Sequence, residues 1–405
     1  MVVKAGNKQT EAGVIPRNWD VMSLGKFLAL QRGHDLNENQ RRPGNIPVMG
    51  SAGQNGFHDT AIAKGPGVVI GRSGASFGQA HYCKNDYWPH NTAIYVTDFR
   101  GNDPCFSYYF LKSMDFRRYN SGGAQQSLNR NFINPIIVAI PHTPEQRAIA
   151  TALSDADAHI SSLEQVIAKK RDLEQAAIQE LLTGKRRLPG FYNDKGHKLT
   201  DIGKIPEDWN TSKIKDLAKS ITVGFVGSMA PLFEKEGVPL LRGQNILPNL
   251  LDLTNLKYIS RETHRQWIKS SLYPGDVVLV RVGYPGTACV IPKNLGELNA
   301  ASLVIVRPNH HLLNSNFLCY LLNSPWGKRQ IQERLVGGAQ QVVNTSTTAE
   351  LIIPQPPLPE QAAVVTVLTN MDAELATLEQ KRDKTKAIKQ GMMQELLTGR
   401  IRLMS

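Results

Sequence analysis

The stretch EQRAIATALSDADAHISSLEQVIAKKRDLEQAAIQELLTGKRRL, residues 145–188, returns near the carboxyl end as EQAAVVTVLTNMDAELATLEQKRDKTKAIKQGMMQELLTGRIRL, residues 360–403. The two copies align without a gap at an offset of 215 residues (360 minus 145). Each copy follows a proline and reaches a glycine, Gly184 or Gly399, near its end. Proline at the start and glycine just past the end are typical of helices. The sequence therefore predicts two long helices, each of roughly 39 residues and about 58 Å.

Apolar residues recur in both copies at alternating intervals of four and three residues. They are Ile149, Leu153, Ala156, Ile160, Leu163 and Ile167 in the first copy, and Val364, Leu368, Met371, Leu375 and Leu378 in the second. This spacing is typical of the a and d positions of a coiled coil. The rest of each helix is polar, so the other copy is the obvious cover for the apolar stripe. The alternative is that each helix packs separately on its own globular domain.

The composition is that of a basic globular protein. The 405 residues are 41% hydrophobic, which is enough for more than one core. The formal net charge of +12 favours a polyanionic partner. The four cysteines are far apart with no C-x-x-C pair, and no segment of the sequence is apolar enough to span a membrane. We expect a protein of the reducing cytoplasm without a membrane partner.

The repetition extends upstream of the helices. Residues 6–19, before the first globular segment, match residues 196–209 at an offset of 190 (209 minus 19), including an Ile-Pro pair and a tryptophan. Within the globular segments, an apolar run predicts a buried strand that leads to an arginine near a glycine, in GPGVVIGRSG (65–74) and YPGDVVLVRVG (273–283). Each globular segment is therefore typical of a mixed α/β domain.

Another repeated segment precedes each long helix. GGAQQSLN (122–129) matches GGAQQVVN (337–344), and an apolar strand follows in both halves. We predict an α/β (mixed α+β) fold with two globular domains in tandem repeat, separated by a pair of long antiparallel coiled-coil helices. The expected parts are a first globular domain at 1–144, a first spacer helix at 145–188, a linker and second globular domain at 189–359, and a second spacer helix with the C-terminal tail at 360–405.

These duplicated motifs resemble the specificity subunits of type I restriction-modification systems. They are I-P-x-x-W, R-x-G after a strand, G-G-A-Q-Q-x-x-N, P-x-x-P-E-Q and Q-E-L-L-T-G, and together they cover nearly the whole chain. The resemblance implies that the globular domains are target-recognition domains, each of which reads one half of a bipartite double-stranded DNA sequence. It also implies that two DNA methyltransferase (modification) subunits, and restriction/translocase subunits for cleavage, assemble on the chain.

The expected helix arrangement also has a consequence for spacing. If the second helix packs back on the first, the pair is antiparallel and the domains lie at its opposite ends. Two such domains could contact half-sites about one helical turn of DNA apart, roughly 34 Å. The helices would then act as a ruler that sets the spacer length.

Arg72, with Ser73 beside it, and Arg281 are candidate DNA contacts. Both arginines follow a buried strand, near glycines that allow the backbone to approach DNA closely. A guanidinium can make two parallel hydrogen bonds to guanine O6 and N7, or bind a phosphate. The alternative is an ordinary surface arginine at the end of a strand.

The shared amides of the G-G-A-Q-Q segment are a second set of candidates. They are Gln125, Gln126 and Asn129 in the first half, and Gln340, Gln341 and Asn344 in the second. A segment so similar in both halves cannot readily specify two different half-sites. We expect it to contact the DNA backbone or to order its own loop.

Specific base contacts should lie where the halves differ. The candidates are Gln54 and Asn55 in the loop expected at 51–58, and Arg242, Gln244 and Asn245 in a second polar loop. An ordinary loop is the alternative for both. Lysines and arginines near the helices, such as Lys170, Arg187, Lys386 and Arg402, could also lie near DNA phosphates or be a solvated face.

No catalytic motif is evident in the sequence. It has no G-x-x-x-x-G-K-[S/T] nucleotide loop, no H-E-x-x-H pair, and only Asn134-Pro135-Ile136-Ile137 as a distant match to a methyltransferase D/N-P-P-Y/F loop. We expect a non-catalytic subunit without cofactor or metal, with methyl transfer, cleavage and ATP hydrolysis in partner subunits. The alternatives are a recognition subunit of a related restriction-modification enzyme outside type I, and a coiled-coil scaffold that binds protein.

Overall fold

The structure is a computed structural model that describes residues 6–122, 126–192, 196–334 and 342–404. The chain forms two compact units, called unit 1 and unit 2 below. Unit 1 comprises Met1–Gln165 and Glu379–Ser405, and unit 2 comprises Val166–Leu378. Each unit contains one globular domain together with part of each long helix.

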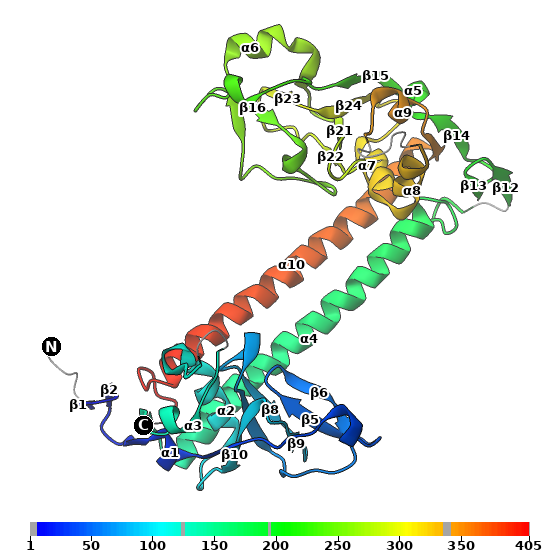
Figure 1. The fold of residues 1–405 in the computed structure, drawn as a ribbon. Coiled ribbons are helices and arrows are strands. Elements are labelled where there is room, and N and C mark those ends of the chain that lie inside the picture. Colours follow the sequence, from blue (N-terminus) through cyan, green and yellow to red (C-terminus); the bar gives the residue numbers. More distant parts are fainter. Residues whose placement is uncertain (1–5, 123–125, 193–195, 335–341, 405) are drawn as a thin grey trace. The chain divides into compact units, whose positions relative to one another are not determined.

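The globular part of unit 1 mixes short helices with mainly antiparallel sheets, in which only β5 and β9 among the described strands pair in parallel (Figure 1). In chain order its elements are β1 (Asn7–Thr10), β2 (Gly13–Pro16), β3 (Asp20–Ser23), α1 (Leu24–Phe27), β4 (Ala29–Arg32), η1 (Glu38–Gln40), β5 (Ile46–Gly50), β6 (Gly53–His58), β7 (Gly67–Gly71), η2 (Gly74–Ser76), β8 (Ala80–Cys83), β9 (Trp88–Pro89), β10 (Ala93–Asp98), α2 (Pro104–Ser113), η3 (Phe116–Tyr119), α3 (Arg130–Ile133) and β11 (Ile137–Ile140). The main sheet has the order β4-β10-β7-β8, and its central strand β7 is buried along its whole length. A smaller sheet has the order β6-β5-β9.

Unit 2 repeats this plan with additional elements. In chain order it contains β12 (His197–Thr200), β13 (Gly203–Pro206), β14 (Asn210–Lys213), α5 (Ile214–Leu217), β15 (Ala218–Val223), η4 (Ala230–Leu232), β16 (Val238–Leu241), η5 (Gly243–Asn245), β17 (Ile246–Leu247), β18 (Leu250–Leu251), β19 (Lys257–Ile259), α6 (Arg261–Gln266), η6 (Ile268–Ser270), β20 (Ser271–Leu272), β21 (Val277–Val280), β22 (Ala288–Val290), β23 (Leu298–Ala300), β24 (Leu303–Pro308), α7 (Ser315–Asn323), α8 (Pro325–Arg334), α9 (Thr345–Ala349) and β25 (Ile352–Gln355). Its main sheet has the order β15-β24-β21-β22.

The two main sheets correspond strand by strand and residue by residue. In unit 1, Ile94 of β10 pairs with Arg32 of β4 on one side and Ile70 of β7 on the other. In unit 2, Val304 of β24 pairs in the same way with Val223 of β15 and with Leu279 of β21. The register therefore defines which positions of the two domains are equivalent.

The two long helices are α4, Thr143–Leu181, and α10, Leu358–Leu396. Both begin two residues before the repeated stretch and end before its glycine. Gly184 and Gly399 adopt positive φ angles of 70° and 71°. Each glycine also lies against a proline, Pro206 or Pro16, so that a Cβ would come within 2.4 or 2.5 Å of the proline Cδ. Residues 182–188, which the sequence assigns to the first helix, therefore lie outside it because the chain turns at this glycine.

Within each unit the two helices lie side by side and run antiparallel (Figure 1). In unit 1, Lys389 Nζ donates to Asp157 Oδ1 at 2.5 Å. Lys386 Nζ lies 2.7 Å from Glu164 Oε1, so the residue number rises in α4 as it falls in α10. Burial raises the pKa of Asp157, but hydrogen bonds from Lys389 and Tyr109 outweigh this effect, and the pKa lies below its ordinary value.

The apolar stripe of each helix has two kinds of partner. Ile149 and Leu153 belong to the core of the globular domain of unit 1. Val364 and Leu368 belong to the equivalent core of unit 2. Later positions, such as Leu163, are buried without being part of those cores. Each helix thus packs first on its own globular domain and then along the other helix. Packing on a domain and packing in a helix pair, the two alternatives predicted from the sequence, therefore each describe part of the helix.

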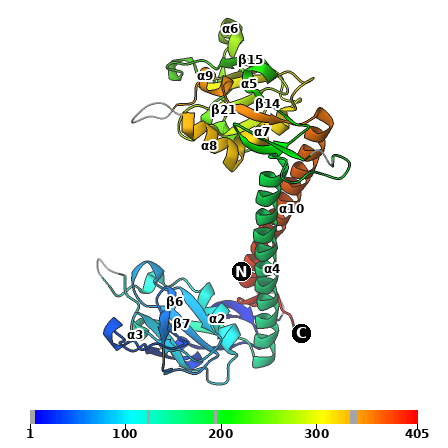
Figure 2. The ribbon, with the colours of Figure 1, turned by 90° about the vertical axis from the view of Figure 1, so that its right-hand side faces the viewer.

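A short helix links each main sheet to the long helices. In unit 1, α2 is capped by Asp103, whose Oδ1 accepts from the backbone N–H of Phe106 at 2.8 Å. Figure 2 shows α2 between β7 and α4, and the Tyr109 hydroxyl donates to Asp157 of α4 at 2.7 Å. In unit 2, α7 makes the same connection through its Tyr320 to Asp372 of α10. The sheets are therefore held in a fixed relation to the helix starts.

A buried carboxylate begins each long helix and closes each unit. In unit 2, Glu360 is 1% exposed and accepts from Trp209 Nε1 at 3.0 Å. Arg187, which follows α4, donates to both Glu360 oxygens at 2.8 and 2.6 Å, and hydrogen bonding to Glu360 raises the arginine pKa. This set of glutamate, tryptophan and arginine is called the Glu–Trp–Arg cluster.

The same cluster recurs in unit 1 with residues from both ends of the chain. Glu145 of α4 accepts from Trp19 Nε1 at 3.1 Å and from Arg402 Nη2 at 2.7 Å. The side chain of Arg402 is 27% exposed, against 9% for Arg187. The cluster of unit 1 is thus the more solvated of the two.

None of the helices in the parts of the chain that the structure describes is long and apolar enough to cross a bilayer.

The Glu–Trp–Arg clusters predict an order of stability effects. Glu360→Ala leaves buried Trp209 without its acceptor and leaves Arg187 paired with Asp208 alone, and should lower the free energy of unfolding by about 3 kcal/mol. Glu145→Ala should cost less, because Arg402 can be hydrated. Glu374→Ala, which removes a helix-pair partner whose side chain is 49% exposed, should cost less than about 1 kcal/mol. Urea unfolding followed by circular dichroism tests this order, and equal effects of Glu360→Ala and Glu374→Ala would contradict it.

Candidate nucleic-acid interface

A polar groove of about 670 Å³ lies at one end of the main sheet of unit 1. It brings together residues that follow β4 and β7 with the segment that leads into α3. The lining residues are Gln31, Arg32, Gly33, His34, Asp35, Arg72, Ile94, Ser121, Ser127, Leu128, Asn129 and Arg130. Three of these are arginines and one is an aspartate, so the groove carries net positive charge.

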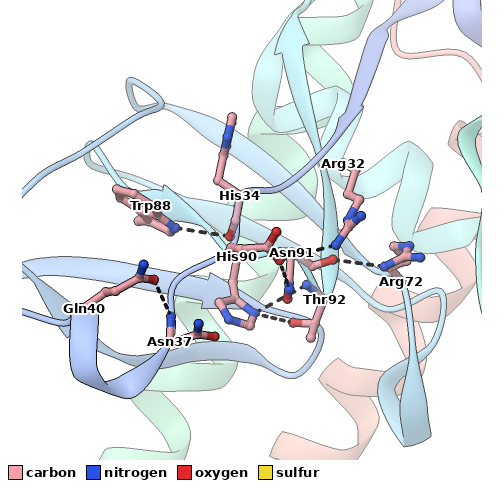
Figure 3. Close-up of polar contacts among 10 residues, drawn as sticks. Arg32, His34, Asn37, Gln40, Arg72, Trp88, His90, Asn91 and Thr92 are labelled. Atoms are coloured by element: carbon pink, nitrogen blue, oxygen red, sulfur yellow. Dashed lines mark hydrogen bonds and ion pairs between the residues drawn. The ribbon is translucent and has the colours of Figure 1, made fainter.

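Arg72, one of the lining residues of this groove, is held by its backbone. Its N–H donates to Thr92 O at 2.8 Å, and its carbonyl accepts from Leu128 N at 2.7 Å. The side chain is half-buried, and Nη1 donates to Asn91 O at 3.3 Å (Figure 3). The guanidinium is therefore held in place and has further N–H groups in a fixed fork.

Two further arginines of the groove were not found from the sequence. Arg32 ends β4 and is exposed, with Nη2 3.4 Å from Asp35 Oδ1. Asp35 Oδ1 also accepts from Asn91 Nδ2, and Figure 3 shows Arg32, Asn91 and Arg72 close together. Arg130, directly after Asn129, donates to Leu30 O at 3.3 Å. Neither arginine is in a repeated motif, so only the fold shows that they converge.

The shared amide segment has a structural role at the side of the groove. Asn129 caps α3, with Oδ1 accepting from Asn131 N at 2.9 Å. Ser73 forms a β-bridge with Ser127, and its carbonyl accepts from Ser51 Oγ at 2.6 Å. Gln126 is exposed, whereas Gln125 lies outside the described residues. These contacts order the loop around Arg72.

Unit 2 repeats this arrangement around Arg281. Its carbonyl accepts from Val343 N at 3.0 Å, and its Nε donates to Val343 O at 3.3 Å. Asn344 caps α9, with Oδ1 accepting from Thr347 N at 2.7 Å. Gln340 and Gln341 lie outside the described residues. The two halves thus share an arginine fastened to the segment that precedes the capping asparagine.

The segment expected as a loop at 51–58 is mostly a strand. Residues from Gly53 onward form β6, which pairs antiparallel with β5. Gly53 has a φ of 93°, which permits the tight turn between the two strands. Gln54 and Asn55 are exposed on this strand, and Asn55 O accepts from Arg41 Nη1 at 2.9 Å. The prediction of a loop was wrong. Backbone pairing with β5 forms a strand here, although the residues are of types that are common in turns.

The second set of candidate base contacts, Arg242, Gln244 and Asn245, is only partly exposed to solvent. Asn245 is 1% exposed, and its side chain donates to Asp252 O at 3.0 Å and accepts from Arg242 N at 3.1 Å. Its assignment as a DNA contact is therefore wrong, because its amide is already used inside the domain. Arg242 lies over the Phe233 ring at 5.6 Å, and burial lowers its pKa. Gln244 is exposed.

Several basic residues near the helices are engaged in ion pairs. Arg187 and Arg402 belong to the Glu–Trp–Arg clusters, and Lys386 pairs with Glu164. Lys170 Nζ lies 2.8 Å from Glu374 Oε1. Arg187 and Arg402 are therefore engaged by buried carboxylates of their own units, whereas Lys170 and Lys386 form exposed pairs, and their contact with DNA phosphates stays a prediction.

The buried cysteines Cys83 and Cys289 lie among the described residues. Burial raises the pKa values of the Cys83 and Cys289 thiols to about 12, so both are protonated at neutral pH. In those parts of the chain, no group of three or more His, Cys, Asp or Glu residues is placed to hold a metal ion.

Comparison with known proteins places this geometry in a family. The family model for the type I restriction modification DNA specificity domain matches residues 16–175 and 206–389. A protein of Methanocaldococcus jannaschii assigned as the specificity subunit of the type I restriction enzyme MjaX is 29% identical over 217 residues, which cover 51% of this chain but only 50% of that protein. The MjaVIII specificity subunit of the same organism is 25% identical over 309 residues, covering 74% of this chain and 71% of that protein.

A solved structure supports the fold. The S subunit of a type I restriction-modification system from M. genitalium matches with a TM-score of 0.61 at 15% sequence identity, covering 96% of this chain and 97% of that one. Because the family model covers both repeated halves of the sequence, this protein belongs to the family of type I restriction modification DNA specificity domains.

Proposed function

We propose that this protein is the sequence-specific DNA-binding specificity subunit of a type I restriction-modification complex. Each globular domain binds one half-site of a bipartite double-stranded DNA target. The observation that carries this proposal is the repeated sheet end, where the carbonyls of Arg72 and Arg281 accept an equivalent backbone hydrogen bond, from Leu128 N and Val343 N, within different surroundings. An arginine that is held in the same way in both domains, among different neighbouring residues, suits two domains that bind the same DNA backbone and recognise different base sequences.

Arg72 and Arg281, called the retained arginines because both domains have them, suit contacts to the DNA backbone. A contact present in both domains carries no information that distinguishes two half-sites, whereas a phosphate is present at every step of DNA. Arg72, Ser73, Gln126 and Asn129 therefore position unit 1, and Arg281 and Asn344 do the same for unit 2. Gln54 and Asn55 in unit 1 and Gln244 in unit 2 are exposed and remain proposed contacts to DNA. The formal net charge of +12 supports a polyanionic ligand.

The long helices connect the two domains and provide surfaces for partners. We assign to α4 and α10 the role of setting the distance between the half-sites. Two DNA methyltransferase subunits bind along this pair, and restriction/translocase subunits join them in the full complex. Methyl transfer, cleavage and ATP hydrolysis reside in those partners, and the chain itself is a non-catalytic protein of the cytoplasm.

The role of the retained arginines predicts a loss of affinity without a change of specificity. Arg72→Gln or Arg281→Gln should lower affinity for the target about tenfold and reduce the salt dependence of binding by roughly one unit. The complex with its methyltransferase subunits is titrated with duplex DNA at several salt concentrations. Arg100→Gln, beyond the far end of β10, is the matched control. An altered recognition sequence in either variant would contradict the assignment.

The spacing role predicts the result of a paired insertion. Seven residues inserted after Ala168 in α4 and after Leu378 in α10 preserve the apolar repeat and lengthen the pair by about 10 Å. The recognised spacer should grow by up to about three base pairs, with both half-sites unchanged. The motif methylated in the host measures this directly. The same insertion in α4 alone should instead disturb helix pairing, and an unchanged spacer after the paired insertion would refute the spacing role.

A further inference from the structure

The tetrapeptide that begins at the last residue of the edge strand of each main sheet occupies the same place in both domains. Because Arg32 and Val223 pair with equivalent residues, RGHD at 32–35 corresponds to VGFV at 223–226. The two segments share only the glycine. Its N–H donates to the strand next to the edge strand in both units, from Gly33 to Ala93 O of β10 at 2.9 Å and from Gly224 to Leu303 O of β24 at 2.8 Å.

The middle of each tetrapeptide is fixed by the domain itself. A Cβ on Gly33 would meet His90 O at 2.1 Å, and one on Gly224 would meet Ala300 O at 2.6 Å, so both positions require glycine. The third side chain is used internally. His34 Nε2 lies 3.3 Å from the Tyr95 hydroxyl, and Phe225 stacks on Trp267 with ring centroids 3.7 Å apart. The first and fourth side chains are left at the surface.

The first and fourth side chains are charged in unit 1 and apolar in unit 2. In unit 1 they are Arg32 and Asp35, whose side chains are 54% and 68% exposed. In unit 2 they are Val223 and Val226, which are 37% and 59% exposed. Unit 2 adds Val282 and Tyr284, 40% and 83% exposed, next to Arg281. A charged pair has thus been replaced by an apolar surface at an equivalent place beside the retained arginine.

A phosphate contact does not explain the charged pair well. Asp35 Oδ1 lies 3.4 Å from Arg32 Nη2 and would repel a phosphate bound there. The pair does match the major-groove edge of a G·C base pair, because arginine donates to guanine O6 and N7 while a carboxylate accepts from the cytosine N4 amino group. Exposed valines match the C5 methyl group of thymine, which apolar side chains contact in the same groove.

We propose that this tetrapeptide is the base-reading element of each domain. Arg32 and Asp35 recognise a G·C pair in one half-site, and Val223 and Val226 recognise a thymine methyl in the other. The inference rests on the proposed function and adds to it the residues and the base chemistry that distinguish the two domains.

The charged pair is tested by a double substitution with a matched control. Arg32→Gln with Asp35→Asn removes both charges at exposed positions, and should relax or change one G·C position in a single half-site of the motif methylated in the host. Asp98→Asn with Arg100→Gln makes the same changes at the other end of β10 and should leave the motif intact. Unchanged specificity in the first variant, with an unaltered thermal melting curve in both, would overturn the assignment of Arg32 and Asp35.

The apolar pair is tested through the methyl group itself. Duplexes with deoxyuridine in place of thymidine in the half-site assigned to unit 2 should bind the complex about threefold to tenfold more weakly. Val223→Ala with Val226→Ala should abolish that difference. Equal binding of the two duplexes by the unsubstituted protein would overturn this part of the proposal. A host that shows no bipartite motif at all would instead refute the proposed function.

Discussion

The buried carboxylate at the start of each long helix is the interaction on which the architecture depends. Glu145 and Glu360 each join a helix start, a tryptophan that precedes a globular domain and an arginine that follows the other helix. A buried carboxylate is tolerated only when it is paired and hydrogen-bonded, so three distant segments must meet at one point. This requirement explains why P-E-Q, I-P-x-x-W and the arginine after L-L-T-G are repeated together.

The residues that are equivalent in the two domains and the surface residues that differ between them have separate roles. In the two domains, the carbonyls of Arg72 and Arg281 accept one equivalent backbone hydrogen bond, and equivalent asparagines cap the following helices. Around these constant points, RGHD in one domain stands where VGFV stands in the other. Under the proposed function, a duplicated domain keeps its contacts to the DNA backbone while its base preference changes, because the side chains that differ are exposed and contribute little to either core.

Much of the fold could be predicted because helix signals and duplicated motifs are local in sequence, and the mixed α/β domains and paired long helices are confirmed. The site was less predictable. Asn245 was chosen for its amide, which the fold buries, and Arg32 was missed because its neighbours come from β7 and the α3 loop. Arg187 looked like part of a basic face because Glu360, its partner, is far along the chain. Only tertiary pairing distinguishes structural arginines from accessible ones.

The proposed function requires one chain to carry two independent DNA-reading domains at a fixed spacing. Single-molecule methylation sequencing of a host that expresses this protein with its methyltransferase subunit measures both properties together. The expected result is one motif made of two specified half-sites separated by a constant number of unspecified base pairs. Recovery of a single uninterrupted motif would contradict it.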